Sequence, residues 1–339
     1  MKAPFPWFGG KRRVASLVWE ALGDVDNYVE PFAGSLAVLL ERPANHRGAA
    51  ETINDRDYFV ANFWRALSID PQTVAEWCDW PVNEADLFAR HLWLVNEGRV
   101  ALVAGMDADP DFYDPHIAGW WVWGISAWIG SGWCHGTGPW TYDTLDADRQ
   151  RPHLGDAGRG VKRQRPHLGN AGQGVNRKRP HLGNREPGEA FPQIAGTGPL
   201  YDYMWALADR LRRVRVCCGD WGRVVTNGAL HHGDTIGVFL DPPYLGDLRT
   251  KDLYAADDHH IADQVRAWCA QNGNRRGLRI VLAGYEDEHA GRLPGWTMHT
   301  YHANKSYGGS GVNDDNRHKE RLWLSPHCLV GAQMSLFGS

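Results

Sequence analysis

Short apolar strands alternate with amphipathic helices in residues 1–75, and the same alternation returns in residues 200–328. Strands that alternate with helices are typical of a parallel sheet covered by helices. The sequence therefore predicts an α/β fold assembled from two separated parts of the chain. The expected strands lie around residues 28–29, 49–53, 214–218, 235–240 and 279–283, with a closing antiparallel strand at 317–324, and the expected helices at 14–22, 36–41, 58–67, 201–212 and 259–272.

Residues 76–199 break this alternation and are expected to form an insertion. It begins with tryptophan-rich helical patterns and continues into a polar tract in which Arg-Pro-His-Leu-Gly recurs every 14 residues, at Arg151, Arg165 and Arg179. Residues 149–185 hold ten basic residues and one acid, a net charge of +9, whereas the whole chain carries −4. A tract so rich in glycine, proline and arginine cannot build much of a core. We expect it to follow DNA phosphates, with a solvated spacer as the alternative.

The cysteines, the N-terminus and the repeat histidines indicate what kind of protein to expect. The six cysteines include no Cys-x-x-Cys pair and are expected to be reduced and mostly buried. The N-terminus lacks the apolar core of a secretory signal, and the uncharged stretch at 117–134 is interrupted by glycines, so we expect a buried helix and loop there and no membrane partner. The histidines of the repeats are spaced too widely to predict a metal site.

A tetrapeptide at 241–244 directly follows the apolar strand at 235–240. Ligands of open parallel sheets bind beyond the carboxyl ends of the strands, so the position favours chemistry, although a purely structural turn is the alternative. Two prolines remove two N–H donors and leave carbonyls and one carboxylate as acceptors. The amino group of a nucleobase fits such a site, with its two N–H bonds directed at the carboxylate and at a proline carbonyl while the tyrosine stacks on the ring. The candidate catalytic residues are Asp241, Pro242, Pro243 and Tyr244.

Five motifs, in this order, resemble the Dam-type DNA adenine-specific methyltransferases. They are Trp7-Phe8-Gly9-Gly10-Lys11, Glu30-Pro31-Phe32-Ala33-Gly34-Ser35, Asn54-Asp55, Gly219-Asp220 and Asp241–Tyr244. The resemblance covers residues 4–70 and 200–325, and it leaves most of the insertion unmatched. It implies a class I S-adenosylmethionine-dependent methyltransferase fold, which is Rossmann-like with a mainly parallel seven-stranded sheet, and it implies that residues 76–199 form a target-recognition domain.

The resemblance also implies a cofactor site for S-adenosylmethionine. In it, Lys11 reaches the methionine carboxylate, Trp7 packs beside it, Asp55 accepts from the ribose hydroxyls and Asp220 lies near the adenine. One departure is Leu36, where the family usually has a further glycine, so the tightness of this turn is left open. The candidate cofactor-binding residues are Trp7, Gly9, Gly10, Lys11, Glu30, Phe32, Gly34, Ser35, Asp55, Asp220 and Asp241.

The DNA substrate sets a further requirement, because an amino group inside a duplex is reached only when its nucleotide is flipped out. Tyr244 and Tyr307 are expected to stack on the flipped base. The tryptophans at 120–140 are expected to form the core of the insertion, with base contact as the alternative. The candidate DNA-binding residues are Tyr307, Lys162, Arg163, Arg165, Arg177, Lys178 and Arg179.

The tail at 329–339 ends in a short apolar hook on a polar, glycine-flanked segment. It resembles the pentapeptide by which bacterial proteins attach to the replicase sliding clamp, and its alternative is a tail that folds back on the core. Clamp attachment would tether the protein to newly replicated DNA. The candidate partner-binding residues are Gln333, Ser335, Leu336 and Phe337.

The leading hypothesis is a site-specific DNA methyltransferase that acts on the 6-amino group of adenine in duplex DNA, by base flipping and direct attack. Two alternatives stay open: methylation of the 4-amino group of cytosine, and a non-catalytic DNA-binding or clamp-binding protein on the same fold. The resemblance implies a cytoplasmic, nucleoid-associated protein of bacterial or phage origin. Membership of a restriction-modification system is an accompanying expectation.

Overall fold

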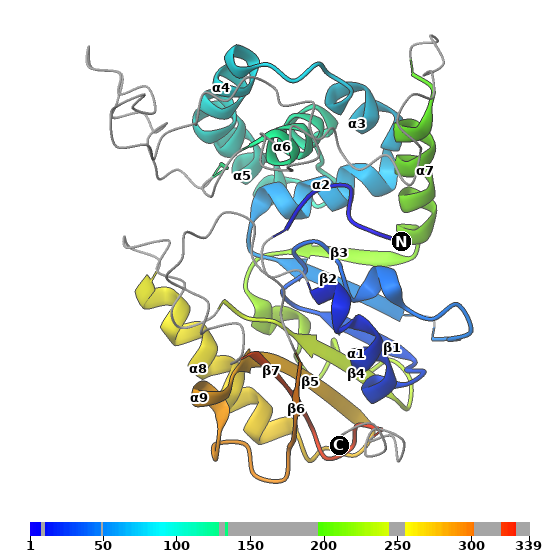
Figure 1. Ribbon diagram of the computed structural model, residues 1–339, viewed down its shortest axis with the longest axis vertical. Coiled ribbons are helices and arrows are strands. Elements are labelled where there is room, and N and C mark those ends of the chain that lie inside the picture. Colours follow the sequence, from blue (N-terminus) through cyan, green and yellow to red (C-terminus); the bar gives the residue numbers. More distant parts are fainter. Residues whose placement is uncertain are drawn as a thin grey trace, which may run out of the picture. The chain divides into compact units, whose positions relative to one another are not determined.

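The computed structural model describes residues 1–7, 11–48, 50–128, 133–134, 196–243, 255–301 and 320–329. They fall into two compact units, each of which is described by itself (Figure 1). The sheet unit lies within Met1–Ala3, Trp7–Asp57 and Arg213–Ser339, and the helical unit lies within Pro4–Pro6 and Tyr58–Arg212.

The sheet unit is built on one seven-stranded sheet with the order β3-β2-β1-β4-β5-β7-β6. The first five strands in this order are parallel, whereas β7 runs antiparallel to both β5 and β6. The predicted α/β class, the mainly parallel sheet and the antiparallel closing strand are confirmed. The strands are β1 (Asn27–Glu30), β2 (Ala50–Asp55), β3 (Val214–Cys218), β4 (Ile236–Leu240), β5 (Leu278–Tyr285), β6 (Thr297–Thr300) and β7 (Glu320–Leu324).

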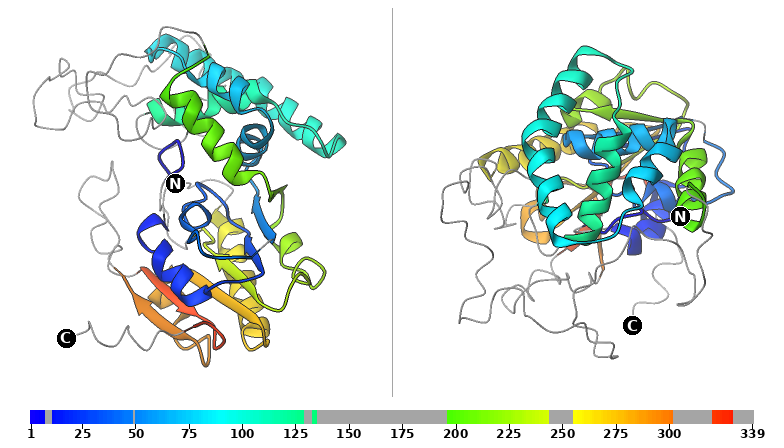
Figure 2. Two further views of the ribbon diagram at one scale, coloured as in Figure 1. Left: turned by 90° about the vertical axis from the view of Figure 1, so that its right-hand side faces the viewer. Right: turned by 90° about the horizontal axis from the view of Figure 1, so that it is seen from above.

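Helices cover both faces of this sheet (Figure 2). Gly237 of β4 lies against Leu22 and Val25, at the end of α1, while the next residue, Val238, belongs to a buried cluster that includes side chains of α8. Because successive strand residues face opposite sides, α1 and α8 lie on opposite faces. The helical elements of the unit are η1 (Lys11–Arg13), α1 (Ala15–Leu22), η2 (Leu39–Glu41), η5 (Trp221–Val224), α8 (Ala255–Asn272) and α9 (Glu286–His289).

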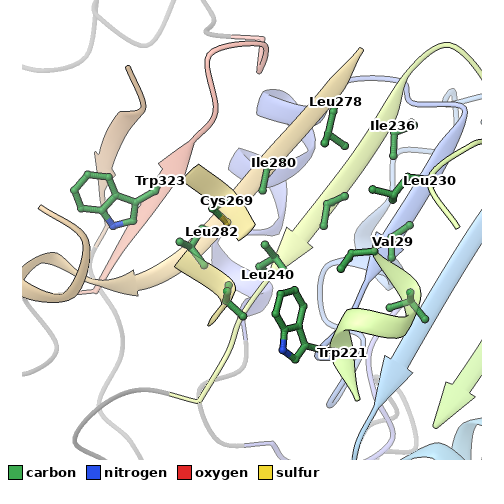
Figure 3. Packing of buried hydrophobic residues seen from close by; sticks show 14 of the residues in the cluster. Val29, Trp221, Leu230, Ile236, Leu240, Cys269, Leu278, Ile280, Leu282 and Trp323 are labelled. Atoms are coloured by element: carbon green, nitrogen blue, oxygen red, sulfur yellow. The ribbon is translucent and has the colours of Figure 1, made fainter. Parts of the chain in front are cut away.

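The core on the α8 face is formed by every second residue of the two central strands (Figure 3). Residues alternate along a strand between the two faces, so this spacing places one apolar row of each strand under the helix. Residues of α8 and η5 complete the cluster. The residues are Ile236, Val238 and Leu240 of β4, Leu278, Ile280 and Leu282 of β5, Val265 and Cys269 of α8, and Trp221 of η5.

Two local predictions in the sheet unit differ from the structure. The predicted helix at 36–41 is reduced to the 3₁₀ turn η2, because Gly34 and Leu36 have φ angles of +46° and +54°, which no right-handed helix accommodates. Strand β6 was not predicted, since three of its four residues are exposed and it shows no apolar alternation.

The helical unit consists of packed helices with well-formed N-termini. Asp70, Asn83 and Asp114 each accept a hydrogen bond from a backbone N–H in the first turn of the following helix. Such caps are a main reason why helices begin where they do. The helices are α2 (Tyr58–Ile69), α3 (Pro71–Cys78), α4 (Glu84–Trp93), the π-helical η3 (Leu94–Gly98), α5 (Arg99–Ala108), α6 (Pro115–Ala127) and α7 (Pro199–Leu211).

Tryptophans form much of the core of the helical unit. Trp121, Trp123 and Trp133 are at most 6% exposed, which confirms the prediction of a packing role for these members of the cluster. Trp140 lies outside the described residues. In the described part of the chain, no helix combines the length and apolar character that a membrane span requires.

The boundary between the units differs from the boundaries drawn at 76 and 199. The chain passes from one unit to the other after Asp57 and after Arg212. Helices α2 and α7 belong to the helical unit because they pack on each other and on α3, and α2 also packs on α6. The assignment of this unit to target recognition stays a prediction.

All six cysteines are free thiols, as expected, and Cys78, Cys134, Cys269 and Cys328 are buried.

Candidate functional site

The predicted acidic residues lie at the carboxyl ends of neighbouring parallel strands. Glu30 ends β1, Asp55 ends β2, Asp220 comes two residues after β3 and Asp241 directly follows β4. These four strands are hydrogen-bonded in the order β3-β2-β1-β4. Because they are parallel, their carboxyl ends lie along one edge of the sheet, which is where ligands bind in open α/β folds.

Lys11 is the buried cation of this edge. Its side chain is 5% exposed, and its Nζ lies 3.3 Å from Oδ1 of Asp241 and 3.7 Å from Oε2 of Glu320. Tyr301 in turn donates a hydrogen bond from its hydroxyl to Oε2 of Glu320 at 2.6 Å. The structure thus brings together the first and the last of the five motifs.

Glu320 and Tyr301 were not predicted. Glu320 opens β7 and Tyr301 follows β6, and both strands take part in antiparallel pairing. Neither residue belongs to a motif, and the segment between them is rich in turn residues, such as Gly308-Gly309, which do not show where the two strands lie. A glutamate that opens an apolar strand was the only available signal.

The glycine-containing turn after β1 is tight and lies against Trp7. A Cβ atom added at Gly34 would lie only 2.5 Å from Nε1 of Trp7, and φ at Gly34 is +46°. Leu36 also has a positive φ, +54°, and is fully buried. Leucine rarely adopts this left-handed conformation, so the backbone keeps here the conformation that glycine favours. The turn is therefore tight despite the leucine.

Asp55 fixes this turn from the neighbouring strand. Its Oδ2 accepts a hydrogen bond from the backbone N–H of Gly34 at 2.8 Å, and its Oδ1 accepts one from that of Asp57 at 2.9 Å. Burial raises the pKa of Asp55 to about 6, and the negative charge of Asp57 acts in the same direction. The carboxyl of Asp55 therefore titrates just below neutral pH.

Asn54, which precedes it, joins three of the strand ends. Its side-chain amide donates to the carbonyl of Pro31 at 3.1 Å and to that of Gly219 at 3.0 Å. The side chain is 1% exposed. Asn54 belongs to a predicted motif, and its role in the structure is to hold the loops after β1 and β3 against β2.

Glu30 lies beneath the turn and not on its surface. It is 2% exposed, and its Oε2 accepts a hydrogen bond from the hydroxyl of Tyr28 at 2.9 Å. Burial raises the pKa of Glu30 to about 8, and the nearby charge of Asp241 contributes to the increase. Glu30 is therefore mainly protonated at pH 7, and it supports the turn from within.

The end of β3 carries Asp220 and an open depression. Asp220 caps η5 by accepting a hydrogen bond from the N–H of Gly222 at 2.9 Å. The ring of Trp221 stacks on Phe32 at 6.1 Å between centroids, which connects η5 to the turn after β1. The depression encloses about 480 Å³ and is lined by Asp220, Trp221, Gly222, Val225, Thr226, Gln264, Ala267, Trp268 and Gln271.

The other candidate cofactor residue of the turn, Ser35, is buried, and so is Pro242 after β4. Within the described ranges, no group of three or more metal-ligating side chains is assembled. Several predicted site residues lie outside the described residues, so their roles stay predictions. They are Gly9, Gly10, Tyr244, Tyr307, Lys162, Arg163, Arg165, Arg177, Lys178, Arg179, Gln333, Ser335, Leu336 and Phe337.

The N-terminal part of the chain matches the model of a known protein family. Residues 7–85 match the family model described as D12 class N6 adenine-specific DNA methyltransferase. A search of curated proteins found no match. The matched segment contains Trp7, Lys11, Gly34 and Asp55, and it ends before Asp241. The match agrees with the family and enzyme class expected from the motifs: over residues 7–85, this chain is similar to the N6 adenine-specific DNA methyltransferases of the D12 class.

Proposed function

We propose that the chain transfers a methyl group from S-adenosylmethionine to the 6-amino group of an adenine flipped out of duplex DNA. The contact between Lys11 and Asp241, at 3.3 Å, carries this proposal. It joins the matched N-terminal segment to the tetrapeptide after β4, which the match does not reach. The seven-stranded order of the sheet supports the class I methyltransferase fold that such a reaction uses.

The donors and acceptors at the sheet edge fit the cofactor. Lys11 offers an ammonium for the methionine carboxylate, and Asp55 offers a carboxylate for the ribose hydroxyls. Asp220, which comes two residues after β3, is proposed to lie near the adenine ring of the cofactor. Bound there, the cofactor supplies an electrophilic methyl group on a sulfonium.

Asp241 acts on the target base. Its carboxylate and the carbonyl of Pro242 accept the two N–H bonds of the adenine amino group, which increases the electron density on the nitrogen. When bound, S-adenosylmethionine would supply the methyl group to this nitrogen and leave as S-adenosylhomocysteine, and the extra proton of the methylated amino group would pass to solvent. Tyr244 and Tyr307 are proposed to stack on the flipped base, because stacking offsets part of the cost of flipping.

Cofactor affinity is expected to fall at acidic pH because of Asp55. Its pKa is raised to about 6, so the carboxyl gains a proton as the pH falls through that value and loses its ability to accept two hydroxyl hydrogen bonds. Binding at pH 5 should be about tenfold weaker than at pH 7, because only about a tenth of the carboxyl is then ionised. Isothermal titration calorimetry with S-adenosylhomocysteine measures this.

Two variants separate Asp55 from other titrating groups. Asp55→Asn should bind more weakly at pH 7 and show no further loss down to pH 5. Asp57→Asn should keep the loss but shift it to lower pH, because the charge of Asp57 raises the pKa of Asp55. An unchanged pH profile in Asp55→Asn would show that another group is responsible.

The basic repeat is proposed to contact DNA phosphates. Neutralising Arg163, Arg165, Lys178 and Arg179 should reduce the slope of log binding constant against log salt by about three to four, close to 0.9 for each lost phosphate contact. Fluorescence anisotropy with a labelled duplex measures the slope. The control neutralises four exposed arginines outside the repeat: Arg213, Arg215, Arg276 and Arg292. Equal slopes in the wild type and the repeat variant would show that the repeat is a spacer that does not contact DNA phosphates.

The tail is proposed to bind the sliding clamp through Gln333, Ser335, Leu336 and Phe337, and it lies outside the described residues. This part of the proposal rests on the resemblance of the tail alone, as does the nucleoid location.

The activity itself is tested by analysing methylated nucleosides. The purified protein is incubated with S-adenosylmethionine and unmethylated bacterial DNA, which is then digested and examined by mass spectrometry. N6-methyladenine is the expected product. N4-methylcytosine would keep the fold and the mechanism but change the base, and the absence of both products would contradict the proposal.

A further inference from the structure

Lys11 lies between two carboxylates, and the second of them belongs to none of the motifs. Its Nζ is 3.3 Å from Oδ1 of Asp241 and 3.7 Å from Oε2 of Glu320. The side chains are largely enclosed, with exposed fractions of 5% for Lys11, 22% for Asp241 and 15% for Glu320. Interactions between charges are stronger in such enclosed positions than at an open surface.

Sheet pairing accounts for the position of Glu320. β7 runs antiparallel to β5, and Glu320, its first residue, lies opposite Tyr285, the last residue of β5. The carboxyl end of β5 lies at the same edge as that of β4, because the two strands are parallel. An antiparallel strand therefore brings its N-terminal residue to the edge where Asp241 is found.

Tyr301 fixes the orientation of the glutamate. Its hydroxyl donates to Oε2 of Glu320 at 2.6 Å, and this oxygen is the one that faces Lys11. Burial, together with the charge of Glu320, raises the pKa of Tyr301, so its hydroxyl remains a neutral donor at all physiological pH values. The same carboxylate oxygen thus contacts both the hydroxyl of Tyr301 and the ammonium of Lys11.

The charges of this cluster complement those of the proposed cofactor. One lysine and two carboxylates sum to −1. S-adenosylmethionine has a sulfonium, an ammonium and a carboxylate and sums to +1, whereas its demethylated product lacks the sulfonium and sums to zero.

We propose that Glu320, held by Tyr301, positions Lys11 and provides the negative charge by which the site binds S-adenosylmethionine in preference to S-adenosylhomocysteine. This inference rests on the proposed function, since it concerns the cofactor of that reaction. Glu320 is a positioning residue here, because its own contacts are with Lys11 and Tyr301.

The test compares the two ligands in Glu320→Gln, which retains the shape of the side chain and an acceptor for Tyr301. Isothermal titration calorimetry without DNA should show a Kd for S-adenosylmethionine raised by about tenfold, the effect of one charge several ångströms away in a partly enclosed site. The Kd for S-adenosylhomocysteine should rise by about threefold or less, because the sulfonium is missing. In turnover, KM for the cofactor should rise while kcat changes little.

Matched variants distinguish charge from structure. Glu286→Gln removes a neighbouring carboxylate that pairs with Arg321 at 2.7 Å, and it should leave both affinities unchanged. Tyr301→Phe should weaken S-adenosylmethionine binding less than Glu320→Gln does. Glu320→Asp keeps the charge and should keep the preference, which provides the test if the glutamine variant does not fold.

An equal loss of both ligands in Glu320→Gln, or no loss of either, would overturn the inference. So would a wild-type protein that binds neither ligand. A wild-type protein that binds both with the expected preference but produces no methylated base would contradict the proposed function and leave the inference standing.

Discussion

Replacing Asp241 by asparagine is expected to lower the rate of methyl transfer at saturating substrates by about 10³-fold, within the range found when a polar group acting on the reacting atoms is removed. In the proposed reaction, the carboxylate accepts a hydrogen bond from the target amino group, and an amide oxygen is a weaker acceptor. The amide also cannot pair with Lys11, whose Nζ is 3.3 Å away. Transfer of labelled methyl groups to duplex DNA, measured under single-turnover conditions, gives the rate.

The matched control is Asp234→Asn. Asp234 is exposed and precedes β4, whereas Asp241 follows the same strand, so both changes remove one carboxylate next to β4, but at opposite ends of the strand. The control should methylate DNA at the wild-type rate. DNA affinity should be similar in all three proteins. A rate within tenfold of wild type for Asp241→Asn would rule out direct action of this carboxylate on the amino group.

A large loss of stability is expected for Trp221→Ala. Trp221 is 7% exposed and belongs to the cluster between the sheet and α8, where it stacks on Phe32 and contacts Trp268 edge-on at 6.3 Å. Removing a buried tryptophan leaves a cavity and should lower the free energy of unfolding by about 3–5 kcal/mol. Urea denaturation followed by circular dichroism measures the change.

Trp205→Ala is the control, because it replaces tryptophan by alanine at an exposed position. This tryptophan, on α7, is 54% exposed, and its indole N–H donates to Oε1 of Gln72 at 3.3 Å. Its loss should cost less than about 1 kcal/mol. Because Trp221 also supports Phe32 in the turn after β1, Trp221→Ala should weaken cofactor binding even at temperatures where it remains folded. Similar stabilities for the two variants would contradict the central place given to Trp221 in the core.

Local sequence signals were sufficient for the parallel half of the sheet. β1, β2 and β4 are short apolar runs that end in acidic motifs, and each motif follows its strand directly. No information about distant contacts is needed to predict that Asp55 and Asp241 lie at one edge, because parallel strands share the direction of their carboxyl ends. The chemical roles assigned to these motifs remain predictions.

The missed features depend on contacts between distant segments. The contact of Glu320 with Lys11 depends on the register in which β7 pairs with β5; an antiparallel closing strand was predicted at 317–324, but its register was not. The helix predicted at 36–41 was wrong because the apolar pattern does not reveal a positive φ at a leucine. The boundary at Asp57 was missed since α2 looks like the helix of a second βα unit, yet its apolar side packs on α6.

The most direct test of the account uses S-adenosylmethionine with a trideuterated methyl group, wild-type protein and unmethylated duplex DNA. Mass spectrometry of the digested DNA should find N6-methyladenine that carries the deuterated methyl group. The Asp241→Asn protein should form almost none in the same time. Deuterated methyl groups on another base alone, or equal labelling of adenine by the two proteins, would contradict the assignment of adenine methylation to Asp241.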